Sequence, residues 1–311
     1  QNLTEKIISG HLVRGRMETG TEIFLKVDST LVHDMSGTLA YIGFEAMGID
    51  KIQVPAAVTF QDHNLVAMDH RSLDDHRFVA SAARRYGSIL SKAGNGICHS
   101  VYYSRIGRPG TVLAGADSHS ATAGALGMLG VGLGGLDVSA IMGGEPMELK
   151  MPAVIGVEVK GRLKPGVSAK DAALWLLKQL SVKGGVGKVL EYFGGGVENL
   201  SVPQRATIAN MGAEMGATSS VFPADEAVRE TLKAVRWLEQ HGAEQLYLKY
   251  CSTFDSTLEG NIGPDIDAVL EAYKIPYTIL CPALPVNRRI VKDGILIVDD
   301  RPVAEGHMAN H

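Results

Sequence analysis

The chain has 311 residues, 45% of them hydrophobic and 21% charged, which is the balance of a globular protein with about two domains. Its formal net charge of -4 gives no excess of basic residues, so we expect no nucleic acid partner. No run reaches the length of about 18 apolar residues that a membrane span requires, so we expect no membrane partner either.

The first residues and the cysteines indicate the compartment. The opening residues carry no basic segment followed by an apolar core, so we expect no signal peptide. The first residue is Gln1 rather than Met, from which we expect a processed or incomplete chain. The three cysteines, Cys98, Cys251 and Cys281, are too widely spaced for a disulfide framework. These features favour the cytoplasm.

The first half of the chain alternates predicted strands and helices. Apolar runs predict three strands, at residues 21–27, 51–60 and 111–114. Pro55 marks an edge or an interruption of the second strand. Helices are predicted at residues 36–47 and from 72 to about 92, and a capping box of Ser72 and Asp75 opens the second helix. This alternation favours an α/β domain with at least partly parallel strands.

Polar residues collect where these elements end. The triplet Asp117, Ser118 and His119 follows the strand at 111–114, at the position where open α/β sheets bind ligands. It offers an acceptor, a hydroxyl and an imidazole, but a turn with a helix cap explains it as well. Three further histidines lie near element ends: His33, His63 and His99. Each of them alone is more simply a buried or capping histidine.

The glycine-rich run at 130–135 follows this triplet. It lacks the G-x-G-x-x-G order of a dinucleotide loop, and the triplet separates it from the strand. We therefore give little weight to a nucleotide site.

The second half begins after Pro152. Strands are predicted at 154–160, 246–251 and 277–280, and helices at 168–180, 225–240 and 264–273. The first helix opens with a capping box formed by Ser168 and Asp171. Asn210 and Glu214 would share one helix face if their stretch is helical, although an ordinary solvated face is the alternative. Asp293-Gly294 between two apolar runs predicts a β-hairpin.

Taken together, several segments resemble the aconitase family. The segments are HDMSGTLAYIGFEAMGID, FQDHN, GNGICH, GADSHSATAGALGMLGVGLGG, SVKGGVGKVLEYFG and ATIANMGAEMGATSSVFP. Their number and order make the likeness specific over about residues 1–230. It implies an aconitase-type α/β/α three-layer core, with a first domain at 1–153 and the start of a second at 154–231. A smaller, partial α/β segment would follow at 232–311.

The resemblance implies a hydro-lyase that dehydrates citrate to aconitate and hydrates it again to isocitrate. The family uses a [4Fe–4S] cluster whose open iron binds the hydroxyl and a carboxylate of the substrate. The implied catalytic residues are Asp62, His63, His99, Asp117, His119 and Glu214. The implied substrate-binding residues are His33, Ser118 and Asn210, of which the last lies beside the cluster.

Roles follow from the same resemblance. Asp62 and His63 form the dyad that protonates the departing hydroxyl, with Asp62 orienting the ring. Asp117 and the imidazoles of His99 and His119 surround the iron-bound water. Glu214 exchanges a proton with iron-bound hydroxide.

Other parts of the family pattern have no counterpart in this chain. The cluster is held by three cysteines, two of them in a C-x-x-C, and none of Cys98, Cys251 or Cys281 occupies a matching position. The arginines that clamp carboxylates and the serine that takes the α-proton also belong to later parts of the family's chain. We therefore expect either a fragment or a subunit whose cluster half comes from another chain, and we assign no metal ligand here.

From about residue 232 the chain resembles the N-terminal domain of four-carbon acid sugar kinases. The segments are AVRWLEQHGAEQLYLKYCSTFDSTLEGNIGP, CPALPVNRRIVKDGILIV and VAEGHMANH. The likeness implies a sugar-acid pocket in which Lys249 pairs with a carboxylate and Asp255 and Ser256 hydrogen-bond hydroxyls. A solvated edge-strand position is the alternative for Lys249. The competing function is a non-catalytic module that binds a polycarboxylate or sugar acid, or part of a sugar-acid kinase fusion.

Overall fold

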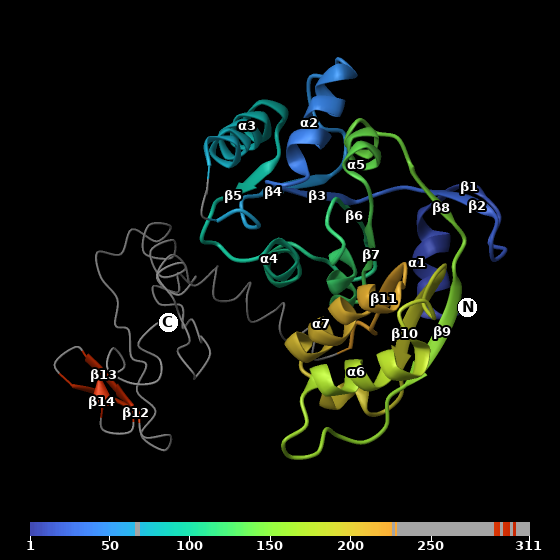
Figure 1. The fold of residues 1–311 in the computed structure, drawn as a ribbon. Coiled ribbons are helices and arrows are strands. Elements are labelled where there is room, and N and C mark those ends of the chain that lie inside the picture. The colour runs from blue at the N-terminus through green and yellow to red at the C-terminus, as the bar shows by residue number, and fades with distance from the viewer. Residues whose placement is uncertain (66–68, 226–227, 229–288, 293–294, 299–300, 303–311) are drawn as a thin grey trace, which may run out of the picture. The chain divides into compact units, whose positions relative to one another are not determined.

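The computed structural model describes residues 1–65, 69–225 and 228, and the backbone of 289–292, 295–298 and 301–302 (Figure 1). The chain divides into two compact units, one formed by residues 1–92 with 96–239 and the other by 93–95 with 240–311. Among the described residues, none of the helices combines the length and the apolar content that crossing a bilayer would need.

A parallel five-stranded sheet with the order β5-β4-β3-β6-β7 forms the centre of the first unit. Its strands are β3 (Ser29–His33), β4 (Ala56–Phe60), β5 (Ile89–Ser91), β6 (Val112–Gly115) and β7 (Leu129–Gly132). The helices that cover it are α2 (Gly37–Ala46), α3 (His70–Tyr86), α4 (Cys98–Arg105) and α5 (Gly135–Met142). Figure 1 shows α2, α3 and α5 along one face and α4 on the other. This is the α/β/α arrangement that the sequence predicts.

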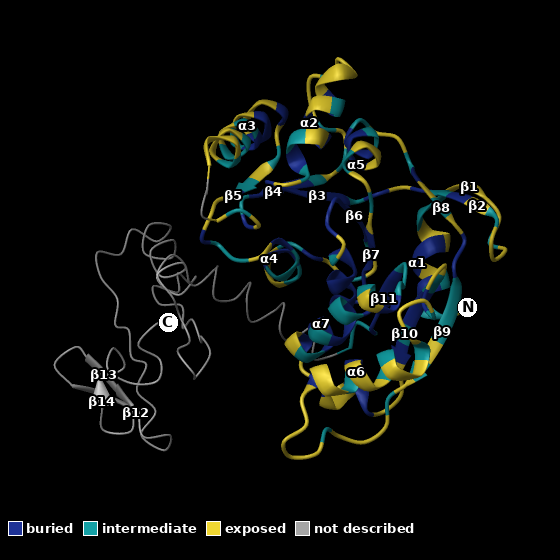
Figure 2. Cartoon of the chain, viewed as in Figure 1, coloured by how far each residue is buried: buried dark blue, intermediate teal, exposed yellow. Residues whose placement is uncertain are grey.

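The central strand β3 is covered on both faces, although only Leu31 and Val32 among its residues are apolar. All five of its residues are buried, as Figure 2 shows for the centre of the sheet. Val32 packs into one core with Tyr41 and Phe44 of α2, whereas Leu31 packs into another with Tyr102 of α4. Alternate side chains of a strand point to opposite faces, so each neighbour in the sequence serves a different layer.

Two further sheets complete the first unit. An antiparallel ribbon has the order β1-β2-β8, with β1 (Leu12–Gly15), β2 (Glu22–Leu25) and β8 (Met147–Lys150). A parallel sheet has the order β11-β10-β9, with β9 (Ala153–Glu158), β10 (Lys188–Phe193) and β11 (Ser219–Val221). The helices around them are α1 (Leu3–His11), α6 (Ala169–Leu180) and α7 (Val202–Met211). Short 3₁₀ segments occupy Ser120–Leu126, Val197–Asn199 and Ala213–Met215.

The two parallel sheets meet through very close backbone packing. The Phe222 amide donates to the Gly124 carbonyl at 2.8 Å, which joins the first 3₁₀ segment to the end of β11. A Cβ on Gly124 would lie 1.5 Å from the carbonyl oxygen of Ser220, so only glycine fits here. The glycines after the Asp117 triplet therefore have a packing role.

In the second unit the structure describes a small antiparallel sheet. Its strands are β12 (Arg289–Lys292), β13 (Ile295–Val298) and β14 (Arg301–Pro302). Strands β12 and β13 are antiparallel, and Lys292 pairs with Ile295 on either side of Asp293-Gly294. This confirms the predicted hairpin. The elements predicted at 246–251, 264–273 and 277–280, and nearly all of the helix at 225–240, lie outside the described residues.

One predicted helix was wrong at both ends. Helix α3 begins at His70 with Asp69 as its cap, rather than at a box formed by Ser72 and Asp75. It ends at Tyr86 because Gly87 takes a left-handed conformation with φ 89°, and β5 follows at once. The prediction instead extended the helix to residue 92.

Other predictions were shortened or confirmed. The strand predicted at 21–27 is β2, which pairs in the antiparallel ribbon. Strand β3 was not predicted. Pro55 precedes β4, which lies inside the sheet rather than at its edge. The capping box of Ser168 and Asp171 at the start of α6 is confirmed. Asn210 and Glu214 do not share one α-helix, because α7 ends at Met211.

Candidate active site

The candidate site lies where three neighbouring strands of the five-stranded sheet end. His33 is the last residue of β3, Asp62 and His63 follow β4, and Asp117 follows β6. These strands are parallel and adjacent, so their carboxyl ends meet at one edge of the sheet. Open α/β sheets bind ligands at this edge.

Asp117 is the centre of the site. Its side chain is 3% exposed, and its Oδ1 accepts from the His99 ring at 3.2 Å and from the His119 amide at 3.0 Å. Its Oδ2 lies 3.5 Å from Nε2 of His63 and 3.9 Å from Nε2 of His33. Burial opposes ionisation, but the hydrogen bonds from His63 and His99 outweigh it and hold the pKa of Asp117 below its usual range. Three imidazoles therefore surround one buried carboxylate.

His63 carries a carboxylate at each of its ring nitrogens. Nδ1 lies 3.0 Å from Asp62 and donates to it, while Nε2 faces Asp117. The hydrogen bond to Asp117, followed by the one to Asp62, raises the pKa of His63 to about 10. Because both ring nitrogens face acceptors, His63 carries a proton on each of them and is positively charged at neutral pH.

The pKa of His33 shifts in the opposite direction to that of His63, although the two rings stack on each other. The ring centroids are 3.8 Å apart and the planes are 16° apart. Nδ1 of His33 accepts the backbone N–H of Met35 at 3.3 Å, which leaves this nitrogen without a proton. Burial and the charge of His63 lower the pKa of His33. The stacked pair thus divides into one charged and one neutral ring.

Helix α4 positions both Asp62 and His99. Asp62 accepts the backbone N–H of Cys98, the first residue of this helix. The backbone N–H groups at a helix N-terminus have no acceptor within the helix, so the Asp62 side chain serves as one here. The next residue along the helix is His99, which reaches Asp117. The sequence prediction missed α4, so it also missed this connection.

The exposed side of the site holds the remaining predicted residues. His119 donates from Nε2 to Glu214 at 3.3 Å, and its Nδ1 lies 3.2 Å from the Ser118 hydroxyl. The ring centroids of His99 and His119 are 5.5 Å apart. Glu214 is 53% exposed, so this pair connects Asp117's neighbourhood to solvent.

The hydrogen bond of Asn210 is made to Thr122 rather than to one of the imidazoles. The Asn210 amide donates to the Thr122 hydroxyl at 3.1 Å, beside a cavity of about 310 Å³ that Ser100, Lys170 and Thr207 help to line. The predicted residues Lys249, Asp255 and Ser256 lie outside the described part of the chain.

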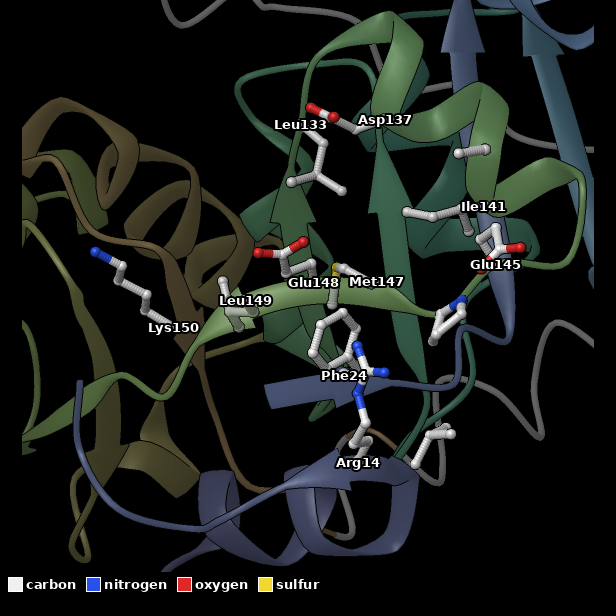
Figure 3. A pocket seen from close by; sticks show the side chains of 13 residues that line it. Arg14, Phe24, Leu133, Asp137, Ile141, Glu145, Met147, Glu148, Leu149 and Lys150 are labelled. Carbon is white, nitrogen blue, oxygen red and sulfur yellow. The ribbon is translucent and has the colours of Figure 1, made fainter. Parts of the chain in front are cut away.

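A larger cavity of about 650 Å³ lies elsewhere in the first unit (Figure 3). It is bounded by the antiparallel ribbon and α5, and the Arg14 guanidinium stacks over Phe24 at 3.8 Å. None of the predicted site residues that the structure describes lines it. We therefore place the candidate site at the strand ends rather than in the larger hollow.

Two residues that the sequence analysis missed support the site, the buried Asp34 and the partly buried His76. Asp34 accepts the backbone N–H of His63 at 3.1 Å and that of Asn64 at 2.9 Å, and Nε2 of His76 donates to it at 2.8 Å. Asp34 follows His33 directly at the end of β3. That position after a strand was the sequence signal that could have identified it. Nothing in the sequence pairs it with His76, which is 42 residues away on α3.

The described residues do not fit the ligand set of a [4Fe–4S] cluster. Such a cluster needs thiolates, and Cys98 is the one free cysteine in the described part of the chain. Cys98 is buried, and burial, followed by the charges of Asp62 and Asp117, raises the pKa of its thiol. It therefore stays protonated. Cys251 and Cys281 lie outside the described residues.

Two clusters have ligand atoms within 4.8 Å of one another, which is close enough for a metal ion. They are His33, Asp34, Asp62 and His63, and Cys98, His99 and Asp117. Their carboxylates already accept hydrogen bonds from backbone and ring N–H groups. The hydrogen bonds account for both clusters, and we assign no metal to either.

The chain matches the aconitase family (aconitate hydratase) over residues 5–292. It is 36% identical over 277 residues to a mitochondrial aconitate hydratase of Gracilaria gracilis, covering 84% of this chain and 36% of that protein. It is 36% identical over 284 residues to the mitochondrial aconitate hydratase of Saccharomyces cerevisiae, covering 86% and 36%. It is 33% identical over 279 residues to the 3-isopropylmalate dehydratase large subunit 1 of Thermotoga maritima, covering 90% and 65%. The chain thus spans about a third of the length of these mitochondrial relatives.

Proposed function

The chain belongs to the aconitase family, and we propose that it supplies the histidine–carboxylate part of a hydro-lyase site for a hydroxy polycarboxylic acid. The observation that carries the proposal is His63, held between Asp62 and Asp117 in its protonated form. Loss of water breaks a C–O bond, and hydroxide is a poor leaving group unless it receives a proton. A positioned acid at that point contributes about 10² to 10⁴ in rate.

The proposed roles follow the contacts. Asp62 accepts from Nδ1 of His63 and fixes the ring, and His63 delivers the proton. Asp117 keeps that proton on His63 and orients His99. His119 passes a proton between the site and solvent through Glu214. These steps run in reverse for hydration.

His33 and Ser118 provide neutral hydrogen-bonding groups for the acid. His33 stacks on the donor ring, and Ser118 lies beside His119. A neutral donor and a hydroxyl suit the carboxylates and hydroxyl of such a substrate. Asn210, held by Thr122, is proposed to border the same space.

The family uses a [4Fe–4S] cluster, which supplies a Lewis acid for the departing hydroxyl. Because none of the three cysteines of this chain occupies a matching position, we expect the ligands of the cluster from another chain. No residue of this chain is assigned as the base that removes the α-proton.

Two substrate classes are candidates. Citrate and its isomers follow from the mitochondrial relatives, whereas an isopropylmalate follows from the Thermotoga relative, of which the chain spans 65%. The compartment stays a prediction: the cysteines favour the cytoplasm, and several relatives are named as mitochondrial proteins.

The competing proposal is a module that binds a polycarboxylate or sugar acid without turnover, with Lys249, Asp255 and Ser256 in a second pocket. The family match extends through residue 292, across most of the segment with the expected kinase likeness. The matches above include no sugar-acid kinase. The hydro-lyase proposal therefore takes precedence.

Anaerobic reconstitution with iron and sulfide, followed by assay with citrate, aconitate and isopropylmalate, separates these proposals. Turnover of one acid supports the hydro-lyase and names its substrate. Calorimetric binding of an acid without turnover, despite a stoichiometric cluster, supports the binding module. Failure of all three acids to bind or react contradicts both.

A further inference from the structure

Asp34 is a fully buried carboxylate beside the candidate site, and none of the roles above uses it. Its side chain is 0% exposed. Burial would raise its pKa, but the hydrogen bonds from Asn64, His76 and the His63 amide outweigh it, and the pKa lies below the ordinary value. A buried charge with three donors is expensive to remove, which makes it a fixed anchor.

The donors show what this anchor holds. Two of them are the consecutive backbone amides of His63 and Asn64, at 3.1 and 2.9 Å. The carboxylate of Asp34 therefore closes the turn that carries the proposed acid, and it fixes the backbone from which the His63 ring projects toward Asp117.

His76 on α3 is the third donor. Its ring is 13% exposed and donates from Nε2 to Oδ2 of Asp34 at 2.8 Å. A second contact ends at the same residue, because the Gln61 side chain donates to the His76 carbonyl at 2.9 Å. Gln61 immediately precedes Asp62. His76 is thus joined to both ends of the segment that carries the dyad.

We propose that His76 is a positioning residue of this site, which acts through Asp34 and Gln61 to hold the Asp62–His63 dyad in line with Asp117. The inference rests on the proposed function, since it assigns His63 as the acid. A helix that contributes no group to the reacting side then sets the orientation of the acid. A displacement of about 1 Å at such a group is enough to cost activity about a hundredfold.

The neighbour of His76 on α3, Asp75, provides a matched control through its contact with Thr38 of α2. The Thr38 hydroxyl donates to Oδ1 of Asp75 at 2.7 Å, so it joins α2 to α3 without touching Asp34 or the dyad. Loss of this bond in Thr38→Val loosens α3 by one hydrogen bond, as His76→Leu does, but leaves the anchor intact.

The test is the ring nitrogen signal of His63 followed by NMR over pH in the full chain, where His33, Asp62 and Asp117 face the ring. His76→Leu is expected to lower the midpoint of His63 by about one pH unit or more, because the ring leaves its acceptors. His76→Gln, whose amide also reaches Asp34, is expected to restore most of the shift. Thr38→Val is expected to leave the midpoint unchanged.

An unchanged His63 midpoint in folded His76→Leu overturns the inference, and so does an equal shift in Thr38→Val. If His76→Leu does not fold, His76→Asn, whose shorter side chain does not reach Asp34, takes its place. The titration needs no turnover, so its failure is distinct from an absence of hydro-lyase activity.

Discussion

His63 lies flat against His33, with 3.8 Å between the ring centroids, yet the two rings differ in protonation. His63 has a carboxylate at each nitrogen, whereas one nitrogen of His33 already accepts a backbone N–H. Stacking two imidazoles is compatible with a charge on only one of them. The edge of the sheet therefore carries a protonated imidazole, His63, next to a neutral one, His33.

This division predicts separate titrations. His63 should remain protonated at pH 8, while His33 should be neutral there, as judged from ring nitrogen shifts in NMR. Asp117→Asn removes the larger of the two contacts that hold the proton, so the midpoint of His63 should fall toward 6.5. A His63 that titrates near 6.5 in the unmodified chain would disprove the assignment.

The same proton predicts a pH dependence of stability. The folded state holds the proton up to about pH 10, and the unfolded chain releases it near the ordinary histidine pKa of about 6.5. The contribution of His63 is therefore complete below 6.5 and is lost as the pH rises through 10. Urea unfolding at several pH values should show a steeper decline in this window for the unmodified chain than for His63→Gln. Parallel curves would contradict the prediction.

Gly124→Ala should destabilise the first unit strongly. The new Cβ would lie 1.5 Å from the Ser220 carbonyl, so β11 or the 3₁₀ segment must move, at a cost of about 1–3 kcal/mol or more. Gly10→Ala is the control, because nothing lies within 4 Å of its Cβ position in α1. It should be neutral or stabilise by up to about 1 kcal/mol. Urea midpoints decide between these outcomes.

Arg205→Met should also destabilise. Arg205 is 0% exposed, pairs with Asp225 at 2.6 and 2.8 Å, and donates to the Val197 and Leu200 carbonyls. Its loss breaks this buried ion pair and removes the guanidinium donor of the Val197 and Leu200 carbonyls, at a cost of about 3–5 kcal/mol.

The control for that substitution is Lys160→Met. Lys160 pairs with Glu158 at 2.9 Å, but both side chains are at least half exposed. Exposed pairs contribute about 0–1 kcal/mol, so the unfolding midpoint should hardly change. Equal losses in the two variants would show that burial does not decide the effect.

The α/β fold and part of the site could be predicted because they depend on local signals. An apolar strand followed by Asp117 is visible in the sequence, as is the capping box at Ser168. Element ends were less predictable. Gly87 ends α3, although later glycines carry the same signal. The apolar residues of α2 also differ in burial, which their residue type does not predict. Phe44 is buried, whereas Leu39 and Ile42 are more than half exposed.

The contacts between distant residues could not be predicted. His119 meets Glu214 across 95 positions, and His76 meets Asp34 across 42. Such pairs depend on where helices pack on the sheet, which hydrophobic periodicity does not specify. The resemblance to the family placed Glu214 near the site, whereas nothing indicated His76. The catalytic roles themselves stay predictions.

The most direct test is the hydration rate of aconitate, or the dehydration rate of isopropylmalate, after anaerobic assembly with iron and sulfide. It compares the unmodified chain with His63→Gln at equal cluster content. In an assembly that includes the partner supplying the cluster half, we expect turnover of one acid, with a loss of about 10² or more in kcat for the variant. Equal rates for the two chains, or no turnover by such an assembly with a full cluster, would contradict the proposal.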